Sequence, residues 1–280
     1  MLSIDRYGGA VSGAPMNDRV ALAALADAGW PALERAPIGG WVARFASGVT
    51  SRANSVYPAG TVQDVPTAIA EAERQYRGRG LHPLFQLSDD DVSLQRELLA
   101  RGYTGHSETL VMTAGIDGAR EALASATGAA SSAAAGPGSE IGDTLEIADA
   151  PDDAWLRLWW SVDGRGGDHE LEVARRIVTG GSALYATIRD EHGAASVGRL
   201  ALVEHDGTLW GGLYALATRP DARSRGHAHA AIRALADAGA ALGVSALWLQ
   251  VLESNAVARR LYDRLGFEHA TTYRYLTAPD

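Results

Sequence analysis

The chain has 280 residues, of which 46% are hydrophobic and 21% charged, a balance typical of folded globular proteins and long enough for two domains. It contains no cysteine, which excludes disulfides, thiolate catalysis and cysteine-based metal sites. The formal net charge of -9 opposes nucleic-acid phosphate, and no apolar run is long enough to cross a membrane. We therefore expect no nucleic-acid partner and no membrane insertion. Because no secretory leader precedes the first domain, we expect a cytoplasmic protein.

A segment of small residues divides the chain in two. Residues 122–139 read ALASATGAASSAAAGPGS, and no large apolar side chain follows Leu123. Such a composition cannot offset the entropy lost on ordering, which predicts a flexible linker over residues 125–140. An Ala-rich helix end followed by a surface loop is the alternative. Either interpretation separates a first domain, residues 1–124, from a second domain, residues 141–280.

The first domain is predicted to mix helices and strands. Apolar residues at helical spacing, with caps and terminating glycines, predict helices over 17–28, 64–77 and 88–100. Apolar, β-branched and aromatic residues predict strands over 41–45, 51–57, 84–87 and 103–113.

The second domain shows the same mixture. Strands are predicted over 144–147, 183–189, 195–204, 208–217, 245–252 and 267–275, and helices over 152–160, 170–179, 226–242 and 254–265. His205-Asp206-Gly207 is a good hairpin turn between two of these strands. A hairpin beside strand–helix–strand units predicts an α/β fold in which a mixed, mostly antiparallel sheet is flanked by helices.

The ends of the two domains resemble each other. Gln86 and Tyr103 are separated by 103 − 86 = 17 positions, and Gln250 and Phe267 by 267 − 250 = 17 positions. In each case a strand, a helix ending at glycine and an aromatic residue follow one another, which predicts a tandem repeat of one fold. In this register Asp91 of the first domain corresponds to Asn255, and Leu98 corresponds to Tyr262.

The sharpest local signal lies between a predicted strand and a long predicted helix, at residues 216–228 (LATRPDARSRGHA). A helix N-terminus has unpaired backbone N–H groups and about half a positive charge, which suits a phosphate. Gly226 lets a ligand approach the backbone closely, and Arg219, Arg223 and Arg225 add positive charge in an otherwise acidic chain. The alternative is a surface turn with solvated arginines.

A second signal follows at residues 249–267 (LQVLESNAVARRLYDRLGF). Ser254 or Asn255 is expected to cap the helix, and Asn255 and Tyr262, seven residues apart, lie on one helix face. The plainer interpretations are a simple helix cap and a core tyrosine with a satisfied hydroxyl.

Together the two segments resemble the GNAT superfamily (GCN5-related N-acetyltransferases). Its pyrophosphate loop, Gln/Arg-x-x-Gly-x-Gly/Ala, is matched by Arg223, Gly226 and Ala228. Its later signature, an Asn followed by a helix ending Leu-Tyr-x-x-x-Gly-Phe, is matched at Asn255 and at residues 261–267. The resemblance covers residues 143–280, and the first domain resembles the degenerate GNAT-like domain of tandem members of the superfamily.

The resemblance implies an N-acetyltransferase that uses acetyl-CoA as co-substrate, needs no metal and acts on a primary amine of a small molecule or peptide by direct attack. Tyr262 would protonate the leaving thiolate, and Asn255 would contact the pantetheine arm. The remaining residues expected to bind acetyl-CoA line the pantetheine arm (Leu216, Ala217, Thr218) or hold the pyrophosphate (Arg223, Ser224, Arg225, Gly226, His227, Ala228).

The general base and the acceptor site are left open. Four residues are candidates for the base, with Tyr214 expected to point into the cleft (Tyr214, Glu253, Glu204, His205). The loop at residues 161–170 carries Asp163, Asp168 and Glu170, which could attract a cationic acceptor or could be solvated. The Trp155, Trp159 and Trp160 side chains are expected in the core or an interface.

The first domain lacks a pyrophosphate loop and has Leu98 in place of the tyrosine. We therefore expect it to bury sheet edges and wall off the acceptor site without binding CoA. A monomer or a homodimer is expected. The competing function is a non-catalytic acyl-CoA-binding sensor or interaction module. The absence of Gly-x-x-x-x-Gly-Lys-Ser/Thr and Gly-x-Gly-x-x-Gly segments disfavours other phosphate-binding folds.

Overall fold

The computed structural model describes residues 19–131 and 143–279. The elements of the first half are α1 (Arg19–Gly29), β1 (Glu34–Ile38), β2 (Trp41–Phe45), β3 (Val56–Tyr57), α2 (Val65–Arg77), β4 (Leu84–Ser88), α3 (Val92–Ala100), β5 (Thr104–Gly115) and α4 (Ile116–Ser131). Those of the second half are β6 (Thr144–Ala148), α5 (Asp153–Asp163), α6 (Asp168–Val178), β7 (Ala183–Asp190), β8 (Gly193–His205), β9 (Thr208–Thr218), α7 (His227–Ala241), β10 (Ala246–Leu252), α8 (Ala256–Arg264) and β11 (Glu268–Thr277).

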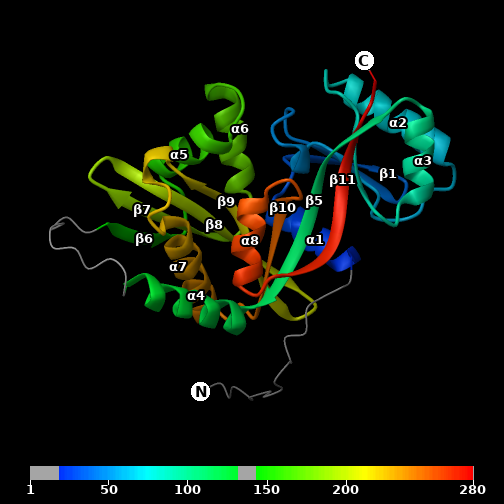
Figure 1. Ribbon diagram of the computed structural model, residues 1–280. Coiled ribbons are helices and arrows are strands. Elements are labelled where there is room, and N and C mark those ends of the chain that lie inside the picture. Colours follow the sequence, from blue (N-terminus) through cyan, green and yellow to red (C-terminus); the bar gives the residue numbers. More distant parts are fainter. Residues whose placement is uncertain (1–18, 132–142, 280) are drawn as a thin grey trace, which may run out of the picture.

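The predicted mixed α/β architecture is confirmed, and the two halves share one sheet. Its order is β1-β2-β3-β4-β11-β5-β10-β9-β8-β7-β6, so each half gives its last strand to the other half (Figure 1). The last strand of the first half, β5, pairs with β10, and the last strand of the chain, β11, pairs with β4. The sequence did not predict this exchange, because the side-chain pattern of a strand is the same in either position.

The register of the exchange reveals a pseudo-twofold axis. Leu87 pairs with Arg274, and Leu110 pairs with Val251. Adding 164 to the residue numbers 87 and 110 of the first half gives 251 and 274, so the second pair is the first pair with the two halves exchanged. Tyr273 lies opposite Thr109, which is again 164 residues earlier (273 − 109), so this pair sits on the axis. Helix α8 also begins and ends 164 residues after α3 (256 − 92 and 264 − 100). The geometry therefore supports the predicted tandem repeat.

The helices cover the shared sheet on both faces. One core cluster joins α1 to α5, α6 and the sheet through Leu25, Trp155 and Ile177, and a second joins α4, α7 and α8 to the opposite face through Leu123, Leu235 and Tyr262. A third cluster joins α2, α3 and the first-half strands to the exchanged strand β11 through Leu276. Helix α1 thus packs on the second half: the Arg199 guanidinium donates a 2.7 Å hydrogen bond to the carbonyl of Gly29 at its C-terminal end.

Three stretches of the first half differ from the sequence prediction, and the first of them is strand β1, which was not predicted. The strand expected over 51–57 is a short 3-10 turn at Ser51–Ala53 followed by the two-residue strand β3. The buried Asn54 amide explains this: its oxygen accepts from the N–H groups of Ala46 and Gly48, and its nitrogen donates to the carbonyl of Val49, folding the segment into a loop. Helix α4 continues to Ser131, into the segment predicted as a linker, because alanine is a strong helix former. Residues 132–140 lie outside the described range.

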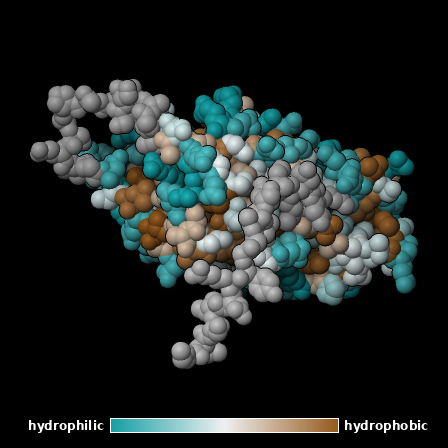
Figure 2. Space-filling model, turned by 90° about the horizontal axis from the view of Figure 1, so that it is seen from below, coloured by the Kyte–Doolittle hydropathy of each residue, from teal (hydrophilic) through white to brown (hydrophobic). Residues whose placement is uncertain are grey.

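No described helix is long and apolar enough to cross a membrane. On the face shown in Figure 2, hydrophobic patches are interrupted by hydrophilic residues.

Candidate active site

Strands β9 and β10 separate halfway along the sheet. They pair in parallel from Trp210–Ala246 to Leu213–Leu249, and the pairing ends there. Ala215, at a φ of 51°, lies where the register of β9 with β8 shifts, which is a β-bulge that bends the strand. Beyond it β9 stays paired with β8 to Thr218, while β10 stays paired with β5 to Leu252. The facing edges of Leu216–Thr218 and of the end of β10 therefore have no strand between them, and their backbone groups can pair with an extended ligand.

Helix α7 begins where β9 leads out of this split. Its N-cap is Gly226, at a φ of 84°, and no side chain caps the helix. The first helical hydrogen bond runs from the N–H of Ala230 to the carbonyl of Gly226, so the N–H groups of residues 227–229 have no partner within the helix. A Cβ added to Gly226 would meet nothing within 4 Å. The structure thus presents an open, positively polarised helix end of the kind that binds phosphate.

The arginines of the loop divide into two groups. Arg223 and Arg225 are exposed beside Gly226, as is Ser224 at a φ of 62°. Arg219 was expected at the same mouth, but its guanidinium is held by Asp190 and Asp221, each at 2.7 Å, and by the carbonyl of Ala194. The ion pairs with Arg219 hold the pKa values of both aspartates below their ordinary range. Arg219 therefore fixes the loop to the β7–β8 turn and is not free for a ligand.

A hollow of about 720 Å³ adjoins the start of α7. It is lined by cationic, acidic and apolar residues in or directly before β6, α7 and α8 (Arg225, His229, Arg233, Arg264, Asp143, Asp237, Leu145, Leu261). His229 faces it, and burial, with the charges of Arg233 and Arg264, lowers the pKa of this imidazole. His227 differs from His229: it is 6% exposed, and its Nε2 lies 2.8 Å from a carboxylate oxygen of Asp143. Ala228, between them, is half-buried in the first turn.

Helix α8 places Asn255 and Tyr262. Asn255 is the N-cap, and its Oδ1 accepts a 3.1 Å hydrogen bond from the N–H of Ala258, which leaves the amide nitrogen for a ligand. Tyr262 is 9% exposed, with its ring against Phe267, and burial raises the pKa of its phenol to about 12. Its hydroxyl makes no hydrogen bond with another described residue. A buried phenol of this pKa stays protonated at neutral pH and can act as a proton donor.

Tyr214, expected to point into the cleft, lies in the core instead. It is 4% exposed, and its ring is 5.3 Å from that of Trp30. Its hydroxyl accepts a 3.1 Å hydrogen bond from Trp248 Nε1 and donates to the carbonyl of Ala26. Burial raises the pKa of Tyr214 to about 12. A phenol that is protonated and already hydrogen-bonded is a poor base, so the structure does not favour this assignment.

The other base candidates lie in different places. Glu204 and His205 pair with Leu209 and Thr208 at the start of β9, whereas the split opens beyond Leu213, so they are at the wrong end of the strand. Glu253 directly follows β10 at the open end of the split; its N–H donates to the carbonyl of Glu108 and its side chain is exposed. Among the four candidates, only Glu253 is placed near the split and free to move.

A second cavity, which we call the acceptor pocket, lies on the α1–α5 face of the sheet beside the end of β10. Its volume is about 380 Å³. Of the three acidic residues expected from the sequence to attract an acceptor, Asp163 and Glu170 line it, whereas Asp168 is exposed and does not. Trp159 and Trp160, which were expected in the core or an interface, also line it. Trp155 is fully buried in the core, as expected.

Most of the acceptor pocket was missed because it comes from distant segments. The first half supplies Trp30 and the loop from Ser47 to Arg52, and the exchanged strands supply Thr109, Tyr273 and Tyr275. The expectation that the first half walls this region is consistent with that lining. Residues 41–45 and 51–57 had been predicted as strands, and no local pattern indicated that Arg52 would face the second half.

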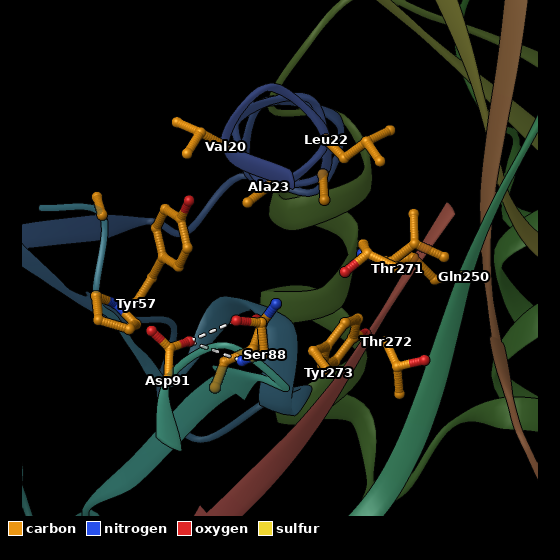
Figure 3. A pocket seen from close by; sticks show the side chains of 15 residues that line it. Val20, Leu22, Ala23, Tyr57, Ser88, Asp91, Gln250, Thr271, Thr272 and Tyr273 are labelled. Atoms are coloured by element: carbon orange, nitrogen blue, oxygen red, sulfur yellow. Dashed lines mark hydrogen bonds between the residues drawn. The ribbon is translucent and has the colours of Figure 1, made fainter. Parts of the chain in front are cut away.

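The first half has its own, much smaller version of the split. Strands β3 and β4 pair only at Val56–Phe85, and the cavity beyond them has a volume of about 70 Å³. Helix α1 covers it with Val20, Leu22 and Ala23, and the Asp91 carboxylate is engaged by Ser88 (Figure 3). A cavity of this size is too small for the arm of a cofactor.

Comparisons with known proteins agree with this geometry. Residues 19–276 match the family model described as "Probable histone acetyltransferase Rv0428c C-terminal". The "Uncharacterized N-acetyltransferase YobR" of Bacillus subtilis is 27% identical over 269 residues, covering 93% of this chain and 98% of the relative. The chain therefore belongs to the Rv0428c C-terminal family, and it is an acyltransferase of the GNAT superfamily.

Solved structures show the same tandem fold. A GCN5-related N-acetyltransferase from Kribbella flavida superposes with a TM-score of 0.63 over 92% of this chain and 96% of that chain, at 16% identity. A tandem GNAT protein from the clavulanic acid biosynthesis pathway superposes with a TM-score of 0.61 over 92% of this chain and 88% of that chain, at 12% identity. At such identities these structures establish the fold alone.

Proposed function

We propose that the chain transfers the acetyl group of acetyl-CoA to a primary amine of a small molecule or peptide. The observation that carries this proposal is the split between β9 and β10 leading into the uncapped start of α7 at Gly226. The extended edge of Leu216–Thr218 suits the pantetheine arm. The exposed residues 223–226 and the first turn of α7 suit the diphosphate, and the adjoining hollow has room for the remainder of the nucleotide.

The chemistry needs few side chains. The neutral amine attacks the thioester carbonyl, the C–S bond breaks as the tetrahedral intermediate collapses, and the thiolate takes a proton from the Tyr262 hydroxyl. Backbone N–H groups beside the bulge in β9 would stabilise the developing oxyanion. The amine must first lose a proton, and Glu253, through water, is the candidate that the geometry favours.

The first half would contribute walls and no chemistry. Leu98 stands at the position equivalent to Tyr262, and the cavity at its own split is too small for a cofactor arm. Trp30 and the Ser47–Arg52 loop instead close one side of the acceptor pocket.

Calorimetric titration with acetyl-CoA tests the proposal. We expect micromolar binding to wild type and its loss in Gly226→Glu, whose carboxylate would occupy the diphosphate position. Gly207→Glu is the matched control: Gly207 has a similar φ of 72° and equally open surroundings, but it lies in the β8–β9 hairpin turn. Failure of wild type to bind acetyl-CoA would refute the proposal. Binding without turnover on a broad amine panel would favour the sensor function.

A further inference from the structure

The acceptor pocket contains a cation without an acidic partner. The Arg52 guanidinium lines the cavity, and its Nε is buried without a hydrogen bond. Tyr273 is its hydrogen-bonding neighbour, and the rings of Trp30 and Tyr214 lie 5.7 and 5.9 Å away. Within the described part of the chain, Arg52 forms no ion pair. Charged groups rarely lie in such aromatic surroundings unless something compensates them.

A second arginine, Arg199, adds to the positive charge. Arg199 is fully buried, and its guanidinium carbon lies 5.9 Å from the Trp30 ring and 5.8 Å from the Tyr214 ring. One of its nitrogens donates to the carbonyl of Gly29, and its Nε and Nη2 have no hydrogen-bond partner among the described residues. Both cations therefore lie against the same aromatic pair, and neither is neutralised by a described carboxylate. An anion entering the acceptor pocket would meet Arg52 directly, and Arg199, which lies behind the shared rings and does not line the pocket, would add attraction at longer range.

The pocket also reaches the reacting end of the split. Leu252, which lines it, is the last residue of β10, three positions beyond the final β9–β10 pair at Leu249. Tyr214, which Arg52 contacts, directly follows Leu213, the partner in that pair. A molecule bound at Arg52 can thus extend its other end toward the split. The volume of about 380 Å³ falls near the lower end of the roughly 300–1,000 Å³ range of small-molecule sites.

We propose that the acceptor is a small amine that also carries an anionic group, a carboxylate or a phosphate ester, and that Arg52 is the residue that selects it. Amino acids and phosphorylated amino alcohols have this chemistry. The proposal rests on the acetyl-transfer function above and narrows its acceptor. Asp163 and Glu170, which line the same pocket, complement the ammonium end before it loses its proton. A lysine-rich peptide would bring further positive charge to Arg52 and is disfavoured.

Matched acceptor pairs test this selection. Free amino acids are compared with their carboxamides, and phosphoethanolamine with ethanolamine, by following thiol release from acetyl-CoA. In wild type we expect kcat/KM for the anionic member of at least one pair to exceed that of its neutral partner by about 10- to 100-fold, as for loss of a charged hydrogen bond. The pair that shows the difference identifies the carboxylate or the phosphate. Equal rates within every pair, or a preference for the neutral members or for lysine-rich peptides, would overturn the inference.

Variants assign the preference to Arg52. Arg52→Met should remove the difference within the preferred pair, whereas Arg165→Met, which removes an exposed arginine at the rim of the same pocket, should retain it. Arg52→Lys keeps the charge, should retain part of the preference and serves if the methionine variant does not fold. A preference that survives in Arg52→Met, or in Arg52→Gln as a second neutral variant, contradicts the assignment.

Binding without turnover separates this inference from the acetyl-transfer proposal. Trp30, Trp159 and Trp160 line the acceptor pocket, so tryptophan fluorescence should change when an anionic acceptor binds to wild type and not when it is added to Arg52→Met. If wild type binds acetyl-CoA in the calorimeter but its fluorescence responds to no anionic acceptor, the inference fails and the acetyl-transfer proposal stands. If wild type binds anionic acceptors but no acetyl-CoA, the acetyl-transfer proposal fails and only the anion site remains.

Discussion

Helices α2 and α7 occupy equivalent positions in the two halves of the sheet. They differ in whether a side chain caps their N-terminal N–H groups. In the second half α7 begins at Gly226 with no side chain over its N–H groups. In the first half α2 begins after Asp64, whose carboxylate accepts from the N–H of Thr67, and Pro66 removes another donor. The first half has therefore placed its own carboxylate where the second half leaves room for a phosphate.

A similar contrast holds at the other end of the site. Leu98 and Tyr262 occupy equivalent positions in α3 and α8, and both are buried. Only Tyr262 carries a proton that could be donated. Under the proposed function, the first half has lost a ligand site through a few side chains while its packing is retained. The burial of a side chain depends on its shape, whereas proton transfer and ligand binding depend on particular atoms.

The largest expected effect comes from the hydroxyl that distinguishes α8 from α3. Tyr262→Phe should lower kcat by about 100- to 10,000-fold, the range for loss of a general acid. Acetyl-CoA affinity should be retained, because the hydroxyl bonds to no other described residue. Since burial raises the pKa of Tyr262 to about 12, its ionisation should not limit the wild-type rate across the neutral pH range. Steady-state thiol release and calorimetry measure both properties.

The first half supplies the control for this experiment. Leu98→Met changes the equivalent buried side chain with little change in volume, so it should cost less than about 1.5 kcal/mol of stability and leave kcat unchanged. A Tyr262→Phe variant with wild-type turnover would remove Tyr262 from the mechanism. A comparable loss of kcat in Leu98→Met would show that packing, and not proton donation, is being measured.

A variant of Tyr214 distinguishes its role from that of Tyr262. Tyr214→Phe should destabilise the fold by about 1–3 kcal/mol, because Trp248 Nε1 would lose its buried acceptor. The pH dependence of kcat should stay as in wild type, because a hydrogen-bonded phenol whose pKa burial raises to about 12 is not the base. Urea unfolding and a pH–rate profile measure these effects. Loss of one limb of the profile would restore Tyr214 as the base.

The sequence predicted the local parts of this site better than its assembly. Helix α8, its cap at Asn255 and the glycine before α7 follow from short-range rules of capping and backbone conformation, and the structure places them as expected. The equal spacing of Gln86–Tyr103 and Gln250–Phe267 also predicted the repeat, because equivalent strands and helices need equal lengths.

The contacts between distant segments could not be predicted in the same way. The exchange of β5 and β11 leaves the pattern of each strand unchanged, so it has no local signature. Arg52 was read as part of a strand; its actual place depends on the Asn54 amide, which folds the preceding residues into a loop. Tyr214 was expected in the cleft because its packing against Trp30, which directly follows α1 in the first half, is a tertiary contact without a local signal.

A smaller effect is expected from the two helix caps that the pseudo-twofold axis relates. Asn255→Ala should cost about 1 kcal/mol of stability through loss of its hydrogen bond to Ala258, and should also weaken acetyl-CoA binding. Asp91→Ala should affect stability alone, because the Asp91 carboxylate holds Ser88 beside a cavity of only 70 Å³. Thermal unfolding and calorimetry on both variants compare them. Equal changes in affinity would contradict the division of roles between the halves.

The smallest effect concerns His229, which lines the hollow beside α7. Burial, with the charges of Arg233 and Arg264, lowers its pKa below the unfolded value of about 6.5. The unfolded chain then binds more protons between the two pKa values, so this group makes stability fall as the pH drops below about 6.5 and level off beneath the folded pKa. The effect is weak because solvent screens a partly exposed ring.

A bound diphosphate would reverse the shift in the pKa of His229, since its negative charge favours the imidazolium, and acetyl-CoA binding near pH 6 should then take up protons. Calorimetry in buffers of different ionisation enthalpy should detect this uptake in wild type and not in His229→Asn. Its absence in a wild type that binds acetyl-CoA would place the diphosphate away from His229.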